Sequence, residues 1–378
     1  MKDFQKAVED GILGLNKGLV TGYNRLDSFT SNLQMESYEV IGGGAKTGKT
    51  AFIDDRYVLK SHILNPDEDI KWIYMSYEIS RLRKTAKWVA WFLYHYYGKL
   101  VSPDVILSKG KYANQSFRNN YNKKLIFEIL EKYVEPLLGK YSSTGRLEKQ
   151  GNIDFHDIPN NPTGIYKYIK HYFNNIGEYK KGWAYTEEDG VKKRIEVQNF
   201  ELKPYYKKRK TIIIIDHLAL VRKERGFNQK ETIDKLSEYM VEIRNTFKPL
   251  IVVTSQFNRD MSKIDRLKFA GNELKPTKED FKDSGNPAQD CNKLYGLFNP
   301  SLYPHIEKYL EINGKSYDIK QIQKRSLAVH LLESRDTEGH VDLMCANFGE
   351  CGYIQELPRQ DLMTNIIYNK LKSNQKLN

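Results

Sequence analysis

The chain has 378 residues, of which 40% are hydrophobic and 12% aromatic, and a formal net charge of +12. This composition allows a sizeable core and excludes wholesale disorder, while three cysteines without CxxC spacing argue against a zinc site or a disulfide framework. The excess of positive charge suits a polyanion and favours nucleic acid over a membrane surface as the partner.

The first residues carry no targeting signal. MKDFQKAVED is charged and lacks the apolar stretch of a signal peptide, and residues 2–10 predict a short helix. Further along, the longest uncharged apolar run, Trp88 to Tyr97, is far short of the ~20 residues of a membrane span. We therefore expect a cytoplasmic protein with no membrane partner.

Short apolar runs separated by helical patterns predict the fold class. YEVIGGG predicts a strand that enters a glycine-rich loop, and the segment from Ala51 carries apolar residues at helical spacing. Further strand-like runs occupy residues 71–76, 211–216, 250–255 and 327–332. This alternation predicts an α/β fold with a twisted, mostly parallel central sheet and helices on both faces.

The stretch between Ser80 and Lys210 is less regular. It begins with helical patterns, and NIDFHDI then predicts an edge strand. Residues 182–206 alternate polar and aromatic side chains around EEDGVKK, which predicts a surface β-hairpin inside an insertion at about 175–210. The last residues, KLKSNQKLN, are expected to be frayed.

A phosphate-binding loop lies between the first predicted strand and the helix that follows. Its sequence matches GxxxxGK[ST] in full, and its glycines let backbone amides and the helix N-terminus face a phosphate. Lys49 is expected to reach the β- and γ-phosphates, and the Thr50 hydroxyl to ligate Mg²⁺. The ATP-binding residues are predicted to be Gly43, Gly44, Ala45, Lys46, Thr47, Gly48, Lys49 and Thr50.

Polar side chains follow three other predicted strands. Asp216 ends the run IIIID, where a carboxylate can hold Mg²⁺, and Glu78 follows WIYMS, where one can accept a proton from the attacking water. Gln256 and Asn258 follow LIVVTS, where an amide can sense the phosphate or the water. Each residue alone is also explained as a solvated loop residue. The ordered set predicts ATP hydrolysis, with Lys49, Glu78 and Gln256 as catalytic residues.

The order of these segments resembles the C-terminal motor domain of the DnaB-family (superfamily 4) replicative DNA helicases, which has a RecA-like fold. GLVTGYNRLD resembles the lead-in to the P-loop, SYEIS the segment with the catalytic glutamate, and IIIIDHLALV the Walker B strand. VVTSQFNRD resembles the segment that links nucleotide state to DNA, and the segment from Lys278 to Phe298 the DNA-facing one. LAVHLLESRDTEGHV resembles the last strand and the arginine-finger turn, so Arg335 is the expected finger.

The resemblance implies a RecA-like domain at residues 18–360, followed by a tail at 361–378. Residues 1–17 then form a linker helix that either packs on an adjacent subunit or is loose. The implied activity is that of an ATP-dependent, ring-forming helicase, a hexamer that moves 5′ to 3′ on single-stranded DNA. A helicase loader or a primase is a further implied partner.

Basic residues on loops of such a ring would neutralise DNA phosphates. Two groups of candidates follow the strands at 211–216 and 250–255, although a solvated basic surface explains them equally well. The first group is Arg222, Lys223 and Arg225, and the second is Arg259, Lys263 and Arg266.

The sequence departs from the family pattern at Glu333, where the finger turn usually carries a lysine, and at His217 and Ala219 after the Walker B aspartate. A carboxylate near the finger weakens the positive field that acts on a neighbour's ATP. Two alternatives to a helicase therefore stay open. One is a recombinase or DNA-stimulated ATPase without unwinding, and the other is a nucleotide-gated assembly protein with little turnover.

Overall fold

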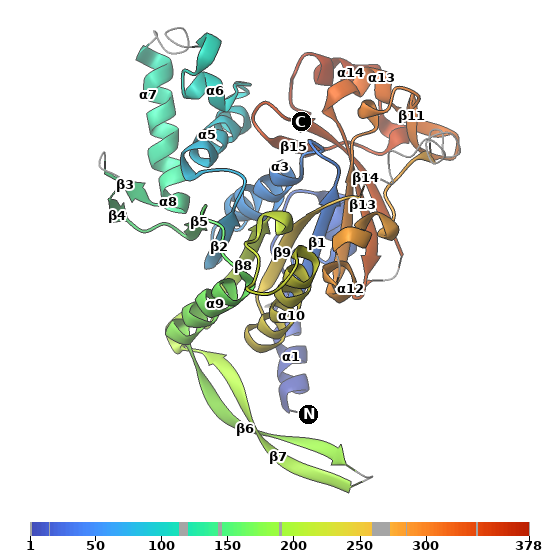
Figure 1. The fold of residues 1–378 in the computed structure, drawn as a ribbon. Coiled ribbons are helices and arrows are strands. Elements are labelled where there is room, and N and C mark those ends of the chain that lie inside the picture. The colour runs from blue at the N-terminus through green and yellow to red at the C-terminus, as the bar shows by residue number, and fades with distance from the viewer. Residues whose placement is uncertain are drawn as a thin grey trace.

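A nine-stranded sheet forms the centre of the molecule, in the order β15-β14-β13-β10-β1-β9-β8-β2-β5 (Figure 1). The computed structural model describes all residues except 1, 15, 113–119, 143–145, 189–190, 259–272, 285, 338 and 378. The strands of the sheet are β1 (Ser37–Gly43), β2 (Ile70–Ser76), β5 (Ile153–His156), β8 (Lys210–Asp216), β9 (Leu250–Gln256), β10 (Lys293–Phe298), β13 (Ser326–Ser334), β14 (Val341–Phe348) and β15 (Tyr353–Glu356).

The six strands from β10 to β5 run parallel, and β13, β14 and β15 continue the sheet as an antiparallel meander. Alternate side chains of the parallel strands enter two separate cores, so that Val40 lies in one and Ile41 in the other. Both faces of the sheet are therefore covered, as a parallel sheet requires. The predicted fold class, α/β with a mostly parallel sheet, is confirmed.

Helices cover both faces of this sheet. The helix that starts at the glycine-rich loop and α5 pack on one face, and α9 and α10 pack on the other (Figure 1). A π-helical stretch, Asp54–Lys60, joins α3 and α4 into one continuous helix. The helices are α1 (Lys2–Ile12), α2 (Asn24–Thr30), α3 (Lys49–Ile53), α4 (Ser61–Leu64), α5 (Arg81–Tyr97), α6 (Pro103–Ile106), α7 (Asn120–Ile129), α8 (Glu135–Leu138), α9 (Pro162–Ile176), α10 (Gln229–Phe247), α12 (Pro287–Asp290), α13 (Ile319–Ile322) and α14 (Asn365–Lys372).

The remaining strands form three two-stranded units: β3 (Lys140–Tyr141) with β4 (Leu147–Lys149), β6 (Gly177–Glu188) with β7 (Val191–Leu202), and β11 (Lys308–Ile312) with β12 (Lys315–Asp318). The hairpin of β6 and β7 projects away from the sheet (Figure 1). Stacked aromatic rings hold its base, where Phe247 lies 4.4 Å from Phe173 and 4.7 Å from Phe200, between ring centroids. The predicted surface hairpin is confirmed, although it begins earlier, at Gly177.

Most of the strands and the N-terminal helix are where the sequence predicts them, including the edge strand β5. The prediction was incomplete for β10, β14 and β15, because KLYGLF was assigned to a DNA-facing segment and is instead a fully buried strand beside β1. The prediction of a frayed C-terminal end was wrong. Leu371 is buried, and the amide of Leu377 donates a hydrogen bond to Gln355 Oε1 at 3.0 Å.

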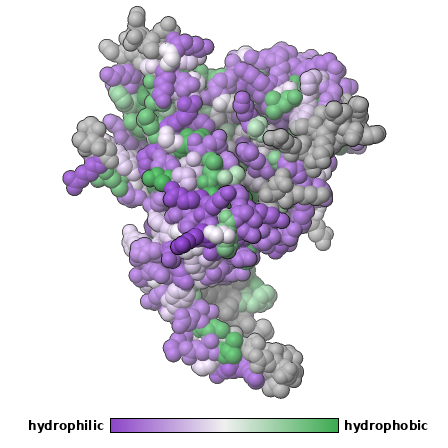
Figure 2. Space-filling model, viewed as in Figure 1, coloured by the Kyte–Doolittle hydropathy of each residue, from purple (hydrophilic) through white to green (hydrophobic). Residues whose placement is uncertain are grey.

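The surface view agrees with a globular domain that is hydrophilic outside. On the face shown in Figure 2, apolar residues form separate small patches among hydrophilic ones. Within the described part of the chain, every helix is too short or too polar to cross a membrane.

Candidate functional site

The glycine-rich loop bends sharply between the end of β1 and the start of α3. Gly48 has a φ of 100°, a conformation that side-chain-bearing residues rarely adopt. A Cβ added at Gly43 would lie 2.6 Å from Thr47 Oγ1, and that hydroxyl donates a hydrogen bond to the Gly44 carbonyl at 2.9 Å. The glycines are therefore needed for the curvature that turns the loop around a bound phosphate.

The Lys49 side chain folds back over this loop. Its ammonium group donates hydrogen bonds to the carbonyls of Gly43 and Gly44, each at 2.8 Å. Burial lowers the pKa of Lys49, and the carboxylates of Asp216 and Glu78 act against that decrease. A phosphate held by the loop would offer this ammonium group stronger acceptors than two neutral carbonyls.

The carboxylate of Asp216 is fixed at the end of β8 by two hydroxyl groups. Thr50 Oγ1 donates to Asp216 Oδ2 and Thr254 Oγ1 donates to Asp216 Oδ1, each at 2.8 Å. Asp216 is almost fully buried, so these two contacts determine its orientation. The P-loop threonine and this aspartate therefore meet directly.

These two residues fit a magnesium ion that is bound together with a nucleotide. A hydroxyl and a carboxylate are hard oxygen donors, and Mg²⁺ in such sites takes few protein ligands and completes its shell with water and phosphate oxygens. Among the described residues, His, Cys, Asp and Glu side chains form no group of three that would hold a metal by themselves. Thr50 and Asp216 are thus suited to a metal whose other ligands come from ATP.

Glu78 and Gln256 lie at the same edge of the sheet. Glu78 follows β2, whose last residue, Ser76, is in register with Asp216, and its carboxylate acts electrostatically on Lys49. Gln256 ends β9 in register with Gly43, at the start of the glycine-rich loop. Both side chains are exposed to solvent. The structure therefore brings the predicted P-loop, metal-side and water-side residues together at the carboxyl edge of the parallel strands.

Asn347 is a neighbour of this loop that the sequence analysis did not identify. Its side-chain nitrogen would lie 2.8 Å from a Cβ added at Gly48, and its Oδ1 is buried without a hydrogen-bond partner. Asn347 belongs to β14, which is far along the chain from the loop. No local motif marks it, since only the pairing of distant strands brings it here.

Arg335 lies at the opposite edge of the sheet. It follows β13, where Ser334 pairs with Lys293, and Lys293 pairs with Glu39 near the beginning of β1. The glycine-rich loop lies beyond the other end of β1, so Arg335 does not reach the P-loop of its own chain. Its side chain is exposed, and its amide donates to the Asn292 carbonyl at 2.9 Å.

The predicted DNA-binding residues divide into two groups. Arg222, Lys223 and Arg225 are exposed in the loop after β8, at the carboxyl edge. The second group lies outside the described residues, and it consists of Arg259, Lys263 and Arg266. A role of either group in DNA binding stays a prediction.

Comparisons with known proteins support the fold. Searches against protein-family models and against curated proteins find no match. The chain is similar in structure to a solved ATPase domain of a DnaB-like helicase, with a TM-score of 0.60 and 16% identity over 94% of this chain and 98% of that one. It is also similar to a DnaB-like replicative helicase described with its interactions with primase, with a TM-score of 0.61 and 17% identity over 93% of this chain and 67% of that one. The chain thus has the RecA-like fold of DnaB-like helicase ATPase domains, as predicted.

Proposed function

Because the chain has the fold of DnaB-like helicase ATPase domains, we propose that it is an ATP-driven motor that moves on single-stranded DNA and unwinds duplex DNA. The observation that carries the proposal is the contact of Thr50 with Asp216 beside the glycine-rich loop. Glu78 and Gln256 stand at the same edge of the sheet. This edge therefore carries groups for phosphate binding, metal binding and proton transfer.

Each residue has a distinct role in this proposal. Lys49 exchanges its two carbonyl acceptors for phosphate oxygens, and Thr50 and Asp216 hold Mg²⁺, which when bound neutralises phosphate charge. Glu78 accepts a proton from the water that attacks the γ-phosphate, a contribution of roughly 10²–10⁴-fold to the rate. Gln256, beside the loop, contacts the phosphate or this water.

A second copy of the chain is needed in this scheme, because Arg335 lies at the opposite edge from the P-loop of its own chain. A head-to-tail ring, which we expect to be a hexamer, would bring each Arg335 to a neighbour's ATP. The N-terminal helix α1 exposes Phe4 by 69% and Ile12 by 80%, apolar surface that suits packing on an adjacent subunit. A helicase loader or a primase is a further proposed partner.

The alternative with little turnover rests on Glu333, whose negative charge would weaken the field of Arg335. Lys278 Nζ lies 2.6 Å from a carboxylate oxygen of Glu333 and offsets that charge. This ion pair weakens the argument for a nucleotide-gated assembly protein and supports the motor.

Unwinding of a forked DNA duplex tests the proposal, together with ATP turnover in the presence of single-stranded DNA. Glu78→Gln should lower turnover by about 10²–10⁴-fold and abolish unwinding, because the amide cannot accept the proton. Glu148→Gln, an exposed glutamate on β4, is the matched control and should change neither.

The two readouts separate the candidate functions. Turnover that survives Glu78→Gln would contradict the ATPase assignment. DNA-stimulated turnover without unwinding by the wild-type protein would favour a recombinase or DNA-stimulated ATPase instead.

A further inference from the structure

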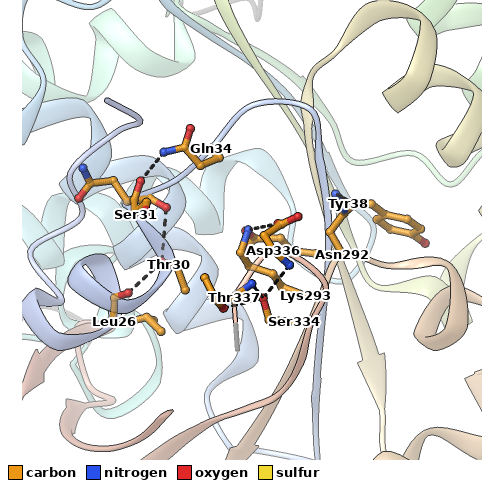
Figure 3. Close-up of polar contacts among 12 residues, drawn as sticks. Leu26, Thr30, Ser31, Gln34, Tyr38, Asn292, Lys293, Ser334, Asp336 and Thr337 are labelled. Atoms are coloured by element: carbon orange, nitrogen blue, oxygen red, sulfur yellow. Dashed lines mark hydrogen bonds and ion pairs between the residues drawn. The ribbon is translucent and has the colours of Figure 1, made fainter. Parts of the chain in front are cut away.

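Lys293 is a buried lysine at the start of β10, where its side chain is only 1% exposed. Its ammonium group lies 3.0 Å from Asp336 Oδ2 and 3.8 Å from Glu39 Oε1. A buried ammonium group is costly unless anions compensate it, so these two carboxylates hold Lys293 and are held by it. Figure 3 shows the contact of Lys293 with Asp336, the residue that directly follows Arg335.

The turn that carries Arg335 is closed by short-range hydrogen bonds as well. Ser334 Oγ accepts hydrogen bonds from the Thr337 hydroxyl at 2.8 Å and from the Thr337 amide at 3.2 Å (Figure 3). The Arg335 amide donates to the carbonyl of Asn292, the neighbour of Lys293. The backbone on both sides of Arg335 is thus tied to the segment at the start of β10.

The Arg335 side chain itself has little to hold it. It is exposed, and the hydrogen bond that its guanidinium group makes is to the carbonyl of Gln289. A long, exposed side chain of this kind loses considerable rotamer freedom when it is fixed in one geometry. Its direction therefore depends on how firmly the turn below it is anchored.

The anchor of the turn extends inward to the helix that starts at the glycine-rich loop. Glu39, which faces Lys293, accepts a hydrogen bond from the Tyr57 hydroxyl at 2.6 Å and lies 3.8 Å from the Arg56 guanidinium group. Arg56 and Tyr57 belong to the continuous helix that begins at Lys49. A row of buried polar contacts thus runs within one chain from the P-loop helix to the turn of Arg335.

We propose that Lys293 and Asp336 are positioning residues, which hold the turn of Arg335 in the orientation that meets the ATP of a neighbouring copy. This inference rests on the proposed function, because Arg335 serves no purpose at that edge without a neighbour's nucleotide. Without the ion pair, Arg335 is present but poorly placed. Misplacement of a catalytic group by about 1 Å can cost about 10²-fold in rate.

Mixing two inactive variants tests the proposal. Arg335→Ala has an intact P-loop and lacks the arginine, and should lose on the order of 10³-fold in turnover. Lys49→Ala has the arginine and lacks the P-loop ammonium group. Mixed rings contain interfaces that combine the intact P-loop of one variant with the intact Arg335 of the other, so ATP turnover should return.

Asp336→Asn is then added to one variant at a time. On the Lys49→Ala chain, which supplies the arginine, it should reduce the recovered turnover by about 10- to 10²-fold and leave the KM for ATP unchanged. On the Arg335→Ala chain, where the turn carries no arginine, it should have no effect. Asp361→Asn is the matched control, since Asp361 is an exposed aspartate paired with Arg359 at 3.3 Å. Asp336→Glu, which keeps the charge, should restore part of the recovery.

Each outcome bears on the proposal. Full recovery with Asp336→Asn on the arginine-supplying chain overturns it. Equal loss from either chain also overturns it, because Asp336 would then act on the fold or on the P-loop of its own chain. If Arg335→Ala and Lys49→Ala do not complement each other at all, the arrangement in trans is wrong, and the proposed function fails together with this inference.

Discussion

The two edges of the central parallel strands hold their exposed functional residues in different ways. At the carboxyl edge, Asp216 is oriented by hydroxyl groups of an adjacent strand and of the P-loop helix, at 2.8 Å. At the amino edge, Arg335 stands on a turn that is tied to the interior by the buried charge of Lys293. Under the proposed function, one edge is complete within a chain, whereas the other is prepared inside one chain to act on another.

The largest expected effect comes from breaking the buried row of charges that supports the amino edge. Arg56 is fully buried, its guanidinium group lies 3.8 Å from Glu39, and its Nη1 donates to the Tyr57 hydroxyl at 2.7 Å. Arg56→Met leaves carboxylates buried without their cation, and we expect it to lower the free energy of unfolding by about 3–5 kcal/mol. Denaturant unfolding measures this change.

A double variant tests the cause of that loss. Glu39→Gln removes the carboxylate that Arg56→Met leaves behind, so the double variant should recover part of the stability. A double variant that is as unstable as the sum of the two single variants would contradict the charge argument and indicate lost packing instead.

The next effect comes from the carboxyl edge. Asp216→Asn removes the charge that faces the metal and keeps the shape of the side chain, so ATP turnover should fall by about 10²-fold, equivalent to about 2.7 kcal/mol. A Mg²⁺ titration of the ATPase rate measures it. Asp69→Asn, at the exposed pair with Arg209, should leave the rate unchanged. Wild-type turnover in Asp216→Asn would remove this residue from the metal site.

The smallest effect sharpens the comparison, since it measures how firmly the amino edge is closed. Burial raises the pKa of the Cys291 thiol to about 12, with Glu333 acting in the same direction and Arg335 and Lys278 against it. The folded protein therefore keeps this thiol protonated at about pH 8, where an unfolded cysteine is partly ionised. Alkylation at that pH should be slow and should report opening of the structure around Cys291.

Asp336→Asn should speed this alkylation, because Cys291 directly precedes Asn292, which accepts a hydrogen bond from the Arg335 amide. We expect an increase of about tenfold or less, about 1.4 kcal/mol, measured by mass spectrometry of the modified peptides. Cys351, whose pKa burial also raises to about 12, is an internal control in the same molecule. An equal increase at both cysteines would indicate a general loss of stability.

The residues of the carboxyl edge are predictable from the sequence because each belongs to a short local pattern. Lys49 and Thr50 lie inside one motif, and Asp216 and Glu78 follow apolar runs that form strands. Consecutive residues determine such features, so one sequence is enough to locate them.

The amino edge is not predictable in the same way. Lys293 is the first residue of an apolar run, and a lysine at that position is usually exposed. Its burial follows from the pairing of β10 with β1 and β13, strands far apart in the sequence. Asn347 was missed for the same reason, since β14 approaches the glycine-rich loop only in the folded chain. Arg335 was predicted by resemblance, but its separation from the P-loop of its own chain required the strand register.

The placement of the P-loop and Arg335 at opposite edges has a consequence for how copies can be counted. A two-fold symmetric pair uses the same patch on both copies, so it cannot join one edge to the other. An open row of copies leaves a P-loop without an arginine at one end and an unused arginine at the other. It therefore holds one completed site fewer than it has chains. Under the proposed scheme, closure of the row makes the number of ATP sites equal to the number of subunits, so turnover per subunit should rise when the last copy joins.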